Sequence, residues 1–416
     1  MTPAADTKKR LPLFAILALI GPGIISASAG NDAGGISTYS EAGARYGYSM
    51  LWMMLAMTPA FMIVQEMAGR MGAVTGKGFA ALIRERFGVR LTFGAMLMLL
   101  GSTAATTIAE FAGVAAAMEL FGVSRYISVP IAALIVWMLV VRGSYTRVEK
   151  VLLALSSVFI AYIVAVFLAR PDWGEVGRAF VVPSIVPDRS FIALSIGLTG
   201  TTIAPWMQFL LQSNIVDKGT TVREWRLARW DVMLGAVAAN LIACAIIITT
   251  GTILHPAGIQ IAGAEDAARA LAPLAGPYAE MLFSVGLLSA SLLAAAVLPL
   301  TSAYAICEAF GWESGLDREW SEAPVFNGLY TVIIVASAAT ILIPGLDLIA
   351  IMLVSQVVNG ILLPFLLIFM MIIINDRTIM GRHVNSRLNN MLAWATIVIV
   401  IALTAILMVM TILNIG

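Results

Sequence analysis

One carboxylate lies inside an apolar segment near the start of the chain. A charged side chain in such a segment indicates a functional role, such as binding a ligand. The segment begins near Leu11, and its later part reads Gly30-Asn31-Asp32-Ala33-Gly34-Gly35. A charge near the centre of a bilayer costs about 2.5–3.5 kcal/mol on insertion scales. The glycines weaken the helix, and non-helical backbone at that depth needs protein or water around it. We predict that Asp32 is a ligand at an unwound point of the first helix; a kinked helix with a paired, structural Asp32 is the alternative.

The elements that position this carboxylate are membrane helices. The chain of 416 residues is 60% hydrophobic and 12% charged, whereas soluble domains carry about 25% charged residues. A net charge of +1 gives no reason to expect a nucleic-acid partner, and no obligate protein partner is evident. Cys244 and Cys307 lie in apolar surroundings and suit packing better than a disulfide. The two histidines, His255 and His383, fall in predicted loops, which excludes a histidine cage for a metal within the bilayer.

Windows of about 20 apolar residues predict eleven membrane spans. Their approximate ranges are 11–46, 49–72, 91–120, 127–142, 148–169, 190–214, 230–254, 278–306, 326–344, 347–375 and 391–414. Most basic residues fall on one side when the N-terminus is cytoplasmic, so we predict a multi-pass plasma-membrane protein with an extracellular C-terminus. Lys8, Lys9 and Arg10 before an apolar run resemble a signal peptide, but a broken helix accounts for that segment as well.

The sixth span is also interrupted. Thr199, Gly200, Thr201 and Thr202 are poor helix formers, and Pro205 removes a backbone donor just after them. Spans one and six correspond if helices 1–5 and 6–10 form two halves of opposite orientation. Matched breaks in an inverted repeat mark a transport site at the midplane. We therefore predict a single transmembrane domain over 1–416, with repeats at about 11–169 and 190–375 and an additional helix at about 391–414.

The motifs resemble those of the Nramp divalent-metal transporters. The matching segments are Gly21-Pro22-Gly23, Asp32-Ala33-Gly34-Gly35, residues 41–48, Thr75-Gly76-Lys77, Glu110 and Ser355-Gln356-Val357. The resemblance runs from about residue 11 to the last helix. It implies an all-α LeuT-type fold with a 5+5 inverted repeat, an eleventh helix, and helices 1 and 6 broken at the midplane.

The departures from the family pattern point to one branch. The family's asparagine falls on Gly35, and its helix-six Met-Pro-His falls on Ala204-Pro205-Trp206. A helix-three aspartate of the proton path falls on Thr107, and a second helix-six histidine falls on Leu211. This combination resembles the Nramp-related magnesium transporters, which implies transport of Mg²⁺ and Mn²⁺ without proton coupling.

The predicted site follows from Asp32 and the resemblance together. Asp32 is the charged ligand, the resemblance adds the backbone carbonyls of Ala29 and Thr201, and Gln356 either reaches the cation or makes an interhelical hydrogen bond. The residues predicted to line the cavity are Asn31, Gly35, Thr202, Ala204, Trp206, Gln208 and Asn359. The altered proton-path positions are Thr107, Glu110, Trp206 and Leu211, and we expect a structural or vestigial role for Glu110.

Three functions are weighed. The first is uptake of Mg²⁺ and Mn²⁺ as largely hydrated ions without protons, in which the ion is cargo and no cofactor is needed. The alternatives are a proton-coupled Mn²⁺/Fe²⁺ symporter and a Na⁺-coupled carrier of organic solutes, although Asp32 would repel a substrate carboxylate. An enzyme is not expected, because no His-Glu-x-x-His motif occurs and no second mid-membrane aspartate matches Asp32.

Overall fold

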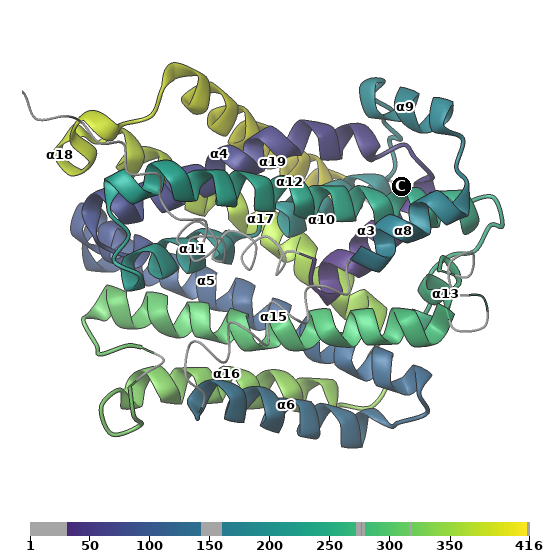
Figure 1. The fold of residues 1–416 in the computed structure, drawn as a ribbon, viewed down its shortest axis with the longest axis horizontal. Coiled ribbons are helices and arrows are strands. Elements are labelled where there is room, and N and C mark those ends of the chain that lie inside the picture. The colour runs from purple at the N-terminus through teal and green to yellow at the C-terminus, as the bar shows by residue number, and fades with distance from the viewer. Residues whose placement is uncertain (1–30, 143–159, 272–275, 277–278, 316–317, 414–416) are drawn as a thin grey trace, which may run out of the picture.

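The computed structural model describes residues 31–142, 160–271, 276, 279–315 and 318–413. All regular elements in these ranges are helices, and they run along one another in a bundle whose ends carry the loops (Figure 1). The longer helices are α3 (Ala33–Tyr46), α4 (Leu51–Thr75), α5 (Phe79–Leu120), α6 (Arg125–Val141), α8 (Ile160–Ala169), α10 (Arg189–Thr202), α11 (Pro205–Asp217), α12 (Val222–Ile253), α15 (Ala279–Phe310), α16 (Pro324–Ile341), α17 (Leu348–Asn375) and α19 (Arg387–Ile412). Shorter elements are α9 (Trp173–Val181), α13 (Ala264–Arg269), α18 (Arg377–Met380) and η3 (Gly381–His383).

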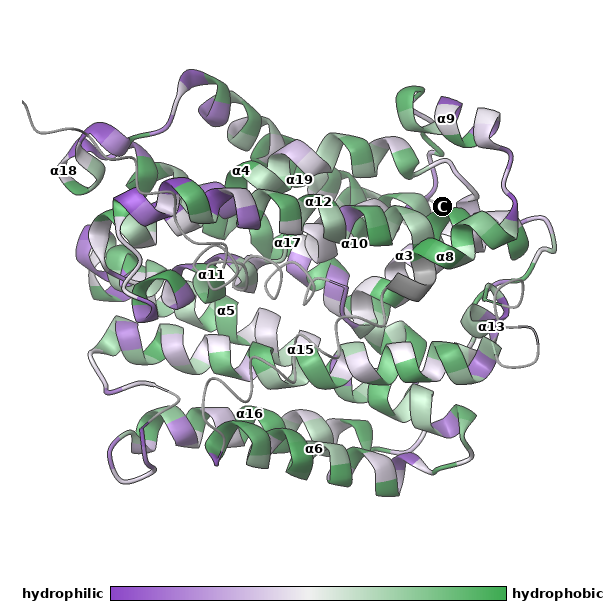
Figure 2. Cartoon of the chain, viewed as in Figure 1, coloured by the Kyte–Doolittle hydropathy of each residue, from purple (hydrophilic) through white to green (hydrophobic). Residues whose placement is uncertain are grey.

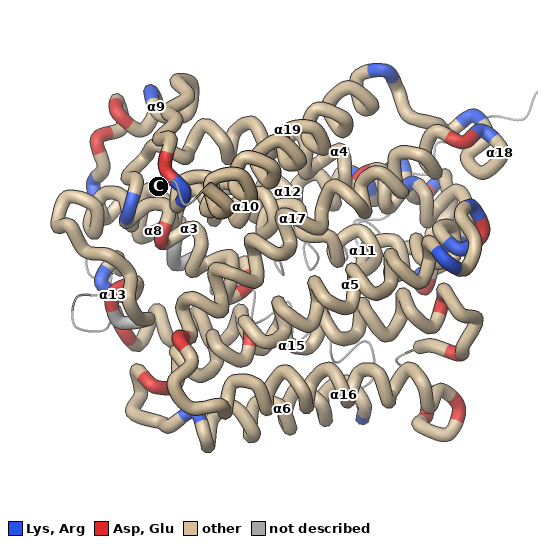
Figure 3. The backbone as a smooth tube through the Cα atoms, turned by 180° about the vertical axis from the view of Figure 1, so that it is seen from behind, with Lys and Arg blue, Asp and Glu red and all other residues tan. Residues whose placement is uncertain are grey.

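The distribution of polarity is that of a membrane protein. Within the described residues, eight helical stretches are long and apolar enough to cross a bilayer, and one of them runs over α10 and α11. Hydrophobic residues cover the middle of the bundle (Figure 2), while most charged residues gather at its two ends (Figure 3). The apolar span of α19 is only 11% buried, so this last helix lies at the periphery with its surface available to lipid.

The predicted break of the sixth span is confirmed. Helix α10 ends at Thr202, Ile203 and Ala204 leave the helical conformation, and α11 begins at Pro205. Proline suits the first position of a helix because its missing N–H has no intrahelical partner there. The corresponding break of the first span is described on one side only: α3 begins at Ala33, directly after Asp32, and the preceding part lies outside the described residues.

Two predicted helix starts are wrong. Helix α5 begins at Phe79 rather than near residue 91, because it runs through a kink at Gly88, whose φ of 74° suits glycine. Helix α12 begins at Val222, where Thr221 and Glu224 form a capping box. Asp231, next to the predicted start of this span at residue 230, therefore lies inside α12.

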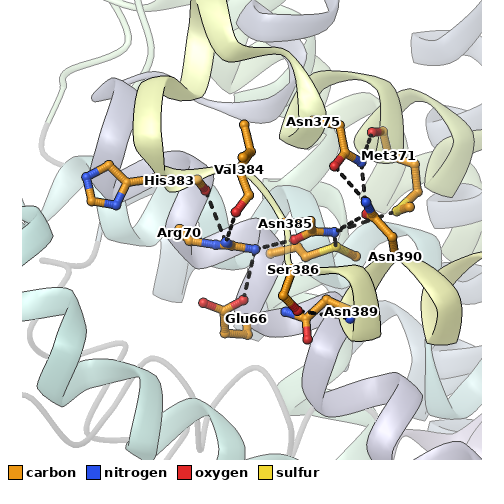
Figure 4. A network of polar contacts seen from close by, with 11 residues as sticks. Glu66, Arg70, Met371, Asn375, His383, Val384, Asn385, Ser386, Asn389 and Asn390 are labelled. Atoms are coloured by element: carbon orange, nitrogen blue, oxygen red, sulfur yellow. Dashed lines mark hydrogen bonds and ion pairs between the residues drawn. The ribbon is translucent and has the colours of Figure 1, made fainter.

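The connection between α17 and α19 is fixed to α4 by one arginine (Figure 4). Arg70 lies 3.2 Å from Glu66 on the same helix and donates to the carbonyls of His383 and Val384 at 3.0 and 3.2 Å. It also donates to the side chain of Asn385. The amides that continue this network are Asn375, Asn385 and Asn390. The peripheral helix α19 is thereby attached to the bundle by partly buried polar contacts as well as by packing.

Candidate metal centre

The start of α3 carries the candidate site. Asp32 is 2% exposed and caps the helix, with its Oδ1 accepting from the backbone N–H of Gly35 at 2.6 Å. Its extended backbone, at φ −71° and ψ 179°, is the conformation of a helix cap. The first N–H groups of a helix have no intrahelical partners and carry its positive end. The chain thus places a buried carboxylate where the helix dipole favours negative charge.

Gln356 links this carboxylate to α17. Its Nε2 lies 3.3 and 3.5 Å from the two oxygens of Asp32, and its Oε1 accepts from Asn359 at 3.1 Å. Asn359 also donates to Thr106 on α5 at 2.9 Å and accepts from Ser102 at 2.5 Å. Gln356 and Asn359 are both fully buried. The structure therefore joins three of the predicted site residues into one hydrogen-bonded chain that reaches from α3 to α5.

A second carboxylate meets the same helix start. Glu110 on α5 accepts from the N–H of Ala33 at 3.1 Å and is fully buried, close enough to Asp32 for their charges to interact. Its other oxygen has no hydrogen-bond partner among the described residues. The two acids thus share the first turn of α3. Sequence reasoning did not expect this proximity, because Asp32 and Glu110 are far apart in the chain.

The sequence contains a pattern that could have indicated this part of the site, namely polar residues spaced along one face of α5. Ser102, Thr103, Thr106, Thr107 and Glu110 recur at helical spacing in an otherwise apolar helix, and all are fully buried. Residues three and four apart share one face of a helix. This face of α5 contacts α17 through Ser102 and Thr106, α15 through Thr103, and α3 through Glu110.

The remaining predicted residues are buried on the broken sixth span and near it. Thr202, at the end of α10, lies 3.4 Å from the hydroxyl of Tyr39 on α3, and Thr201 precedes it, 1% exposed. Asn31 lies 3.5 Å from the carbonyl of Ala239 on α12. Ala204 separates the two half-helices and is 2% exposed.

The side chains on α11 turn toward their own helix or into the core. When the Gln208 amide is oriented with its nitrogen toward the start of α11, that nitrogen donates to the carbonyls of Pro205 and Ala204 at 2.6 and 2.8 Å. Trp206 is fully buried, and its Nε1 has no hydrogen-bond partner among the described residues. Leu211 is fully buried as well. The predicted ligand Ala29 lies outside the described residues.

The donor set is made of oxygen and amide groups. No group of three or more His, Cys, Asp or Glu side chains is arranged to hold a metal within the described ranges. His255 follows the end of α12, and His383 lies in η3, as the loop predictions required. By the resemblance described above, Ala204 and Trp206 occupy the positions where the family's thioether and imidazole are expected on the sixth helix. Carboxylates, carbonyls and water suit Mg²⁺, Ca²⁺ and Mn²⁺.

Comparison with known proteins identifies the family of this chain. Residues 23–410 match the family described as Nramp, natural resistance-associated macrophage protein-like. The chain is a member of the Nramp family. It is 30% identical over 404 residues to the divalent metal cation transporter MntH of Deinococcus radiodurans. The aligned region covers 94% of this chain and 90% of that protein. It is 28% identical over 415 residues to MntH of Burkholderia ambifaria, covering 97% of this chain and 91% of that protein.

Solved structures agree on the fold of this Nramp chain. The manganese transporter of Eremococcus coleocola superposes with a TM-score of 0.78 at 22% identity, covering 98% of this chain and 88% of that one. MhsT in complex with L-phenylalanine superposes with a TM-score of 0.59 at 15% identity, covering 93% of this chain and 97% of that one. The prediction of an all-α membrane protein with the LeuT-type fold is confirmed. The relatives are transporters, which also confirms a transporter rather than an enzyme.

Proposed function

We propose that this Nramp protein takes up Mg²⁺ and Mn²⁺ across the plasma membrane as largely hydrated ions, in the manner of the magnesium-transporting branch. The names of its curated relatives support a divalent metal cation as cargo. The observation that carries the choice of ion is the hard donor set at the start of α3, where Asp32, Gln356 and Glu110 supply only oxygen and amide groups. Mg²⁺ is usually bound through one or two carboxylates and keeps several waters.

The absence of soft ligands sets the expected selectivity. Ala204 offers no thioether where the family has methionine, and Gly35 offers no side-chain amide. We propose Asp32 as the charged ligand, with Gln356 and the carbonyls of Ala29 and Thr201 completing the shell. Ca²⁺ is expected to be carried poorly, because it prefers more ligands at longer distances than Mg²⁺ does.

We also propose that transport runs without protons. Thr107 uses its hydroxyl to donate to the carbonyl of Thr103 at 2.6 Å, and neither it nor Trp206 can titrate at the positions where the family has titrating groups. A divalent ion entering a negative interior gains about 4.6 kcal/mol per 100 mV, which suffices for accumulation. We also propose a cytoplasmic N-terminus, because this orientation places most of the basic residues on the cytoplasmic side.

One observation favours a second candidate, proton-coupled transport. Glu110 lies beside Asp32, and two neighbouring carboxylates can share and pass a proton. A Na⁺-coupled carrier of amino acids is disfavoured by the same pair, because both acids would repel a substrate carboxylate at this helix start.

Flux in proteoliposomes separates these functions. Vesicles carry a pH dye inside, and Mg²⁺ or Mn²⁺ is added outside under an imposed negative potential. We expect metal uptake in the wild type, no uptake in folded Asp32→Ala, and no acidification beyond that of protein-free vesicles. Acidification that rises with metal concentration and disappears in Glu110→Gln would establish the coupled alternative. Near-normal Mg²⁺ uptake by Asp32→Ala would overturn the site.

A further inference from the structure

A cavity of about 210 Å³ lies between α3, α10 and α17, away from the Asp32 site. Its polar lining comes from Thr38, Glu41, Arg45 and Ser190, and the rest of its wall is apolar. Glu41 lies nine residues beyond Asp32, which is about 14 Å along a helix axis. With the cytoplasmic N-terminus proposed above, this cavity lies on the outer side of the site.

Glu41 is an incompletely satisfied acid. The residue is 8% exposed, and the backbone N–H of Ile261 lies near its carboxylate. Its Oε2 is nevertheless buried without a well-formed hydrogen bond among the described residues. Its Oε1 lies 3.7 Å from Arg45 Nη1, and the arginine side chain is 41% exposed. An ion pair at this distance, with one member exposed, contributes little to the stability of the fold. A buried carboxylate oxygen without a hydrogen-bond partner lowers that stability. The site therefore favours a positively charged ligand.

The cavity is aligned with the candidate metal centre. Gly34, Thr38, Glu41 and Arg45 follow one another at spacings of four, three and four residues, which places them along one face of α3. Gly34, at the inner end of this stripe, lies against the Gln356 amide that binds Asp32. Thr38 occupies the middle, with its hydroxyl donating to the Gly34 carbonyl at 2.7 Å and its lone pairs left to accept. The stripe thus leads from the cavity to the site.

The cavity is open on one side and has room for one hydrated divalent ion. Water occupies about 30 Å³ per molecule, so six waters around Mg²⁺ require about 180 Å³. A dehydrated ion would find a single carboxylate and too few ligands here. Resting on the proposed function, we propose that Glu41 forms a second cation site, in which one hydrated divalent cation is held by its waters before it passes to Asp32. Arg45 occupies the mouth as a counter-ion that the arriving cation displaces.

The proposal predicts opposite effects for the two members of the ion pair. Removing the Glu41 charge with Glu41→Gln should raise the apparent KM for Mg²⁺ and Mn²⁺ about tenfold, because an acidic cleft concentrates cations near its entrance. Its maximal uptake rate should stay close to that of the wild type, because Asp32 is intact. Arg45→Gln removes the competing cation and should lower the apparent KM, and Glu41→Asp should stay near the wild type. A merely structural ion pair would make both charge-removing variants worse in the same direction.

Equilibrium binding provides the second measurement. Binding of Mn²⁺ is measured by electron paramagnetic resonance, which detects the free ion. In an Asp32→Asn background we expect weak Mn²⁺ binding, and we expect the additional substitution Glu41→Gln to abolish it. The matched control is Glu119→Gln, which removes an acid that lies 2.8 Å from Arg125 in a separate pair and does not line this cavity. Gel filtration and thermal unfolding establish that each variant is folded.

The outcomes distinguish this site from the proposed function. Equal Mn²⁺ binding with and without Glu41→Gln, or a rise in KM for Arg45→Gln, would overturn the second site even if the wild type transports Mg²⁺. A wild type that carries no divalent ion would overturn the proposed function, while the Mn²⁺ titration would still decide whether Glu41 binds a cation.

Discussion

Gly34→Ala tests whether Gln356 belongs to the metal centre without touching either acid. A Cβ built on Gly34 would overlap the Nε2 of Gln356 and lie 2.9 and 3.0 Å from its Cδ and Cγ. The amide is the end of a flexible side chain, so it can turn away and limit the cost to folding. The methyl group therefore removes Gln356 from Asp32 more readily than it disrupts the helix packing.

The size of the effect follows from the contact that is lost. Gln356 Nε2 lies 3.3 and 3.5 Å from the Asp32 oxygens, and a hydrogen bond to a charged group contributes about 1.5–3 kcal/mol. If the amide orients Asp32 or contacts the ion, losing it should weaken Mn²⁺ and Mg²⁺ binding about 10- to 100-fold. Folding stability should fall by no more than the about 1–3 kcal/mol that losing this hydrogen bond and crowding the fully buried amide cost.

Isothermal titration of Mn²⁺ into detergent-solubilised protein measures the affinity, and thermal unfolding measures the fold. Gly101→Ala is the matched control, because a Cβ at that position in α5 meets nothing within 4 Å. It should leave Mn²⁺ affinity unchanged and stabilise its helix by up to about 1 kcal/mol. Mn²⁺ affinity within twofold of the wild type in folded Gly34→Ala would refute a role for Gln356.

Three further changes test the surrounding structure. Gly360→Ala should destabilise the fold by about 1–3 kcal/mol, because its Cβ would meet backbone of α10, which cannot turn aside; an unchanged unfolding midpoint would contradict that close contact. Arg70→Ala should speed tryptic cleavage between α17 and α19, since it removes the contacts that fix this connection, whereas Arg318→Ala, in an exposed pair, should not. Ala204→Met combined with Gly35→Asn should shift preference from Mg²⁺ toward Mn²⁺ and Cd²⁺, because a thioether favours softer metals; competition uptake that keeps the wild-type ion ranking would refute the argument.

Much of the fold was predictable because bilayer-spanning helices leave a strong local signal. Long apolar windows identified the helices, and Pro205 after a run of threonines identified the break between α10 and α11. Helix ends were less accurate, since the apolar window stops where the helix leaves the bilayer. Helix α5 continues beyond it through Gly88 as far as Phe79, and α12 continues as far as its capping box.

A site residue could be predicted from the sequence alone only where its type is energetically unfavourable in its local sequence. Asp32 is conspicuous because a charge in an apolar, glycine-rich segment is costly, and the structure places it at a helix cap. Gln356 came from the resemblance, and Asn359 was predicted only as a residue lining the cavity. The contact between Ala33 and Glu110 could not be derived, because it depends on how α3 and α5 pack across a separation of 77 residues.

That contact bears directly on how the transporter would be driven. With Thr107 and Trp206 unable to titrate, Asp32 and Glu110 are the acids that meet at the start of α3. Two carboxylates that share one buried site favour a single negative charge, so a proton held by this pair would be displaced by an arriving divalent cation. Proton coupling needs more than this pair, because a proton released there must reach the cytoplasm through further titratable groups. The polar stripe of α5 beyond Glu110 consists of hydroxyls, of which those of the threonines donate to backbone carbonyls and that of Ser102 donates to Asn359. Those hydroxyls can stabilise a hydrated ion, but they do not hold a proton on its way. On this ground we propose that the ion is driven by its own gradient and the membrane potential, as in the uncoupled function proposed above.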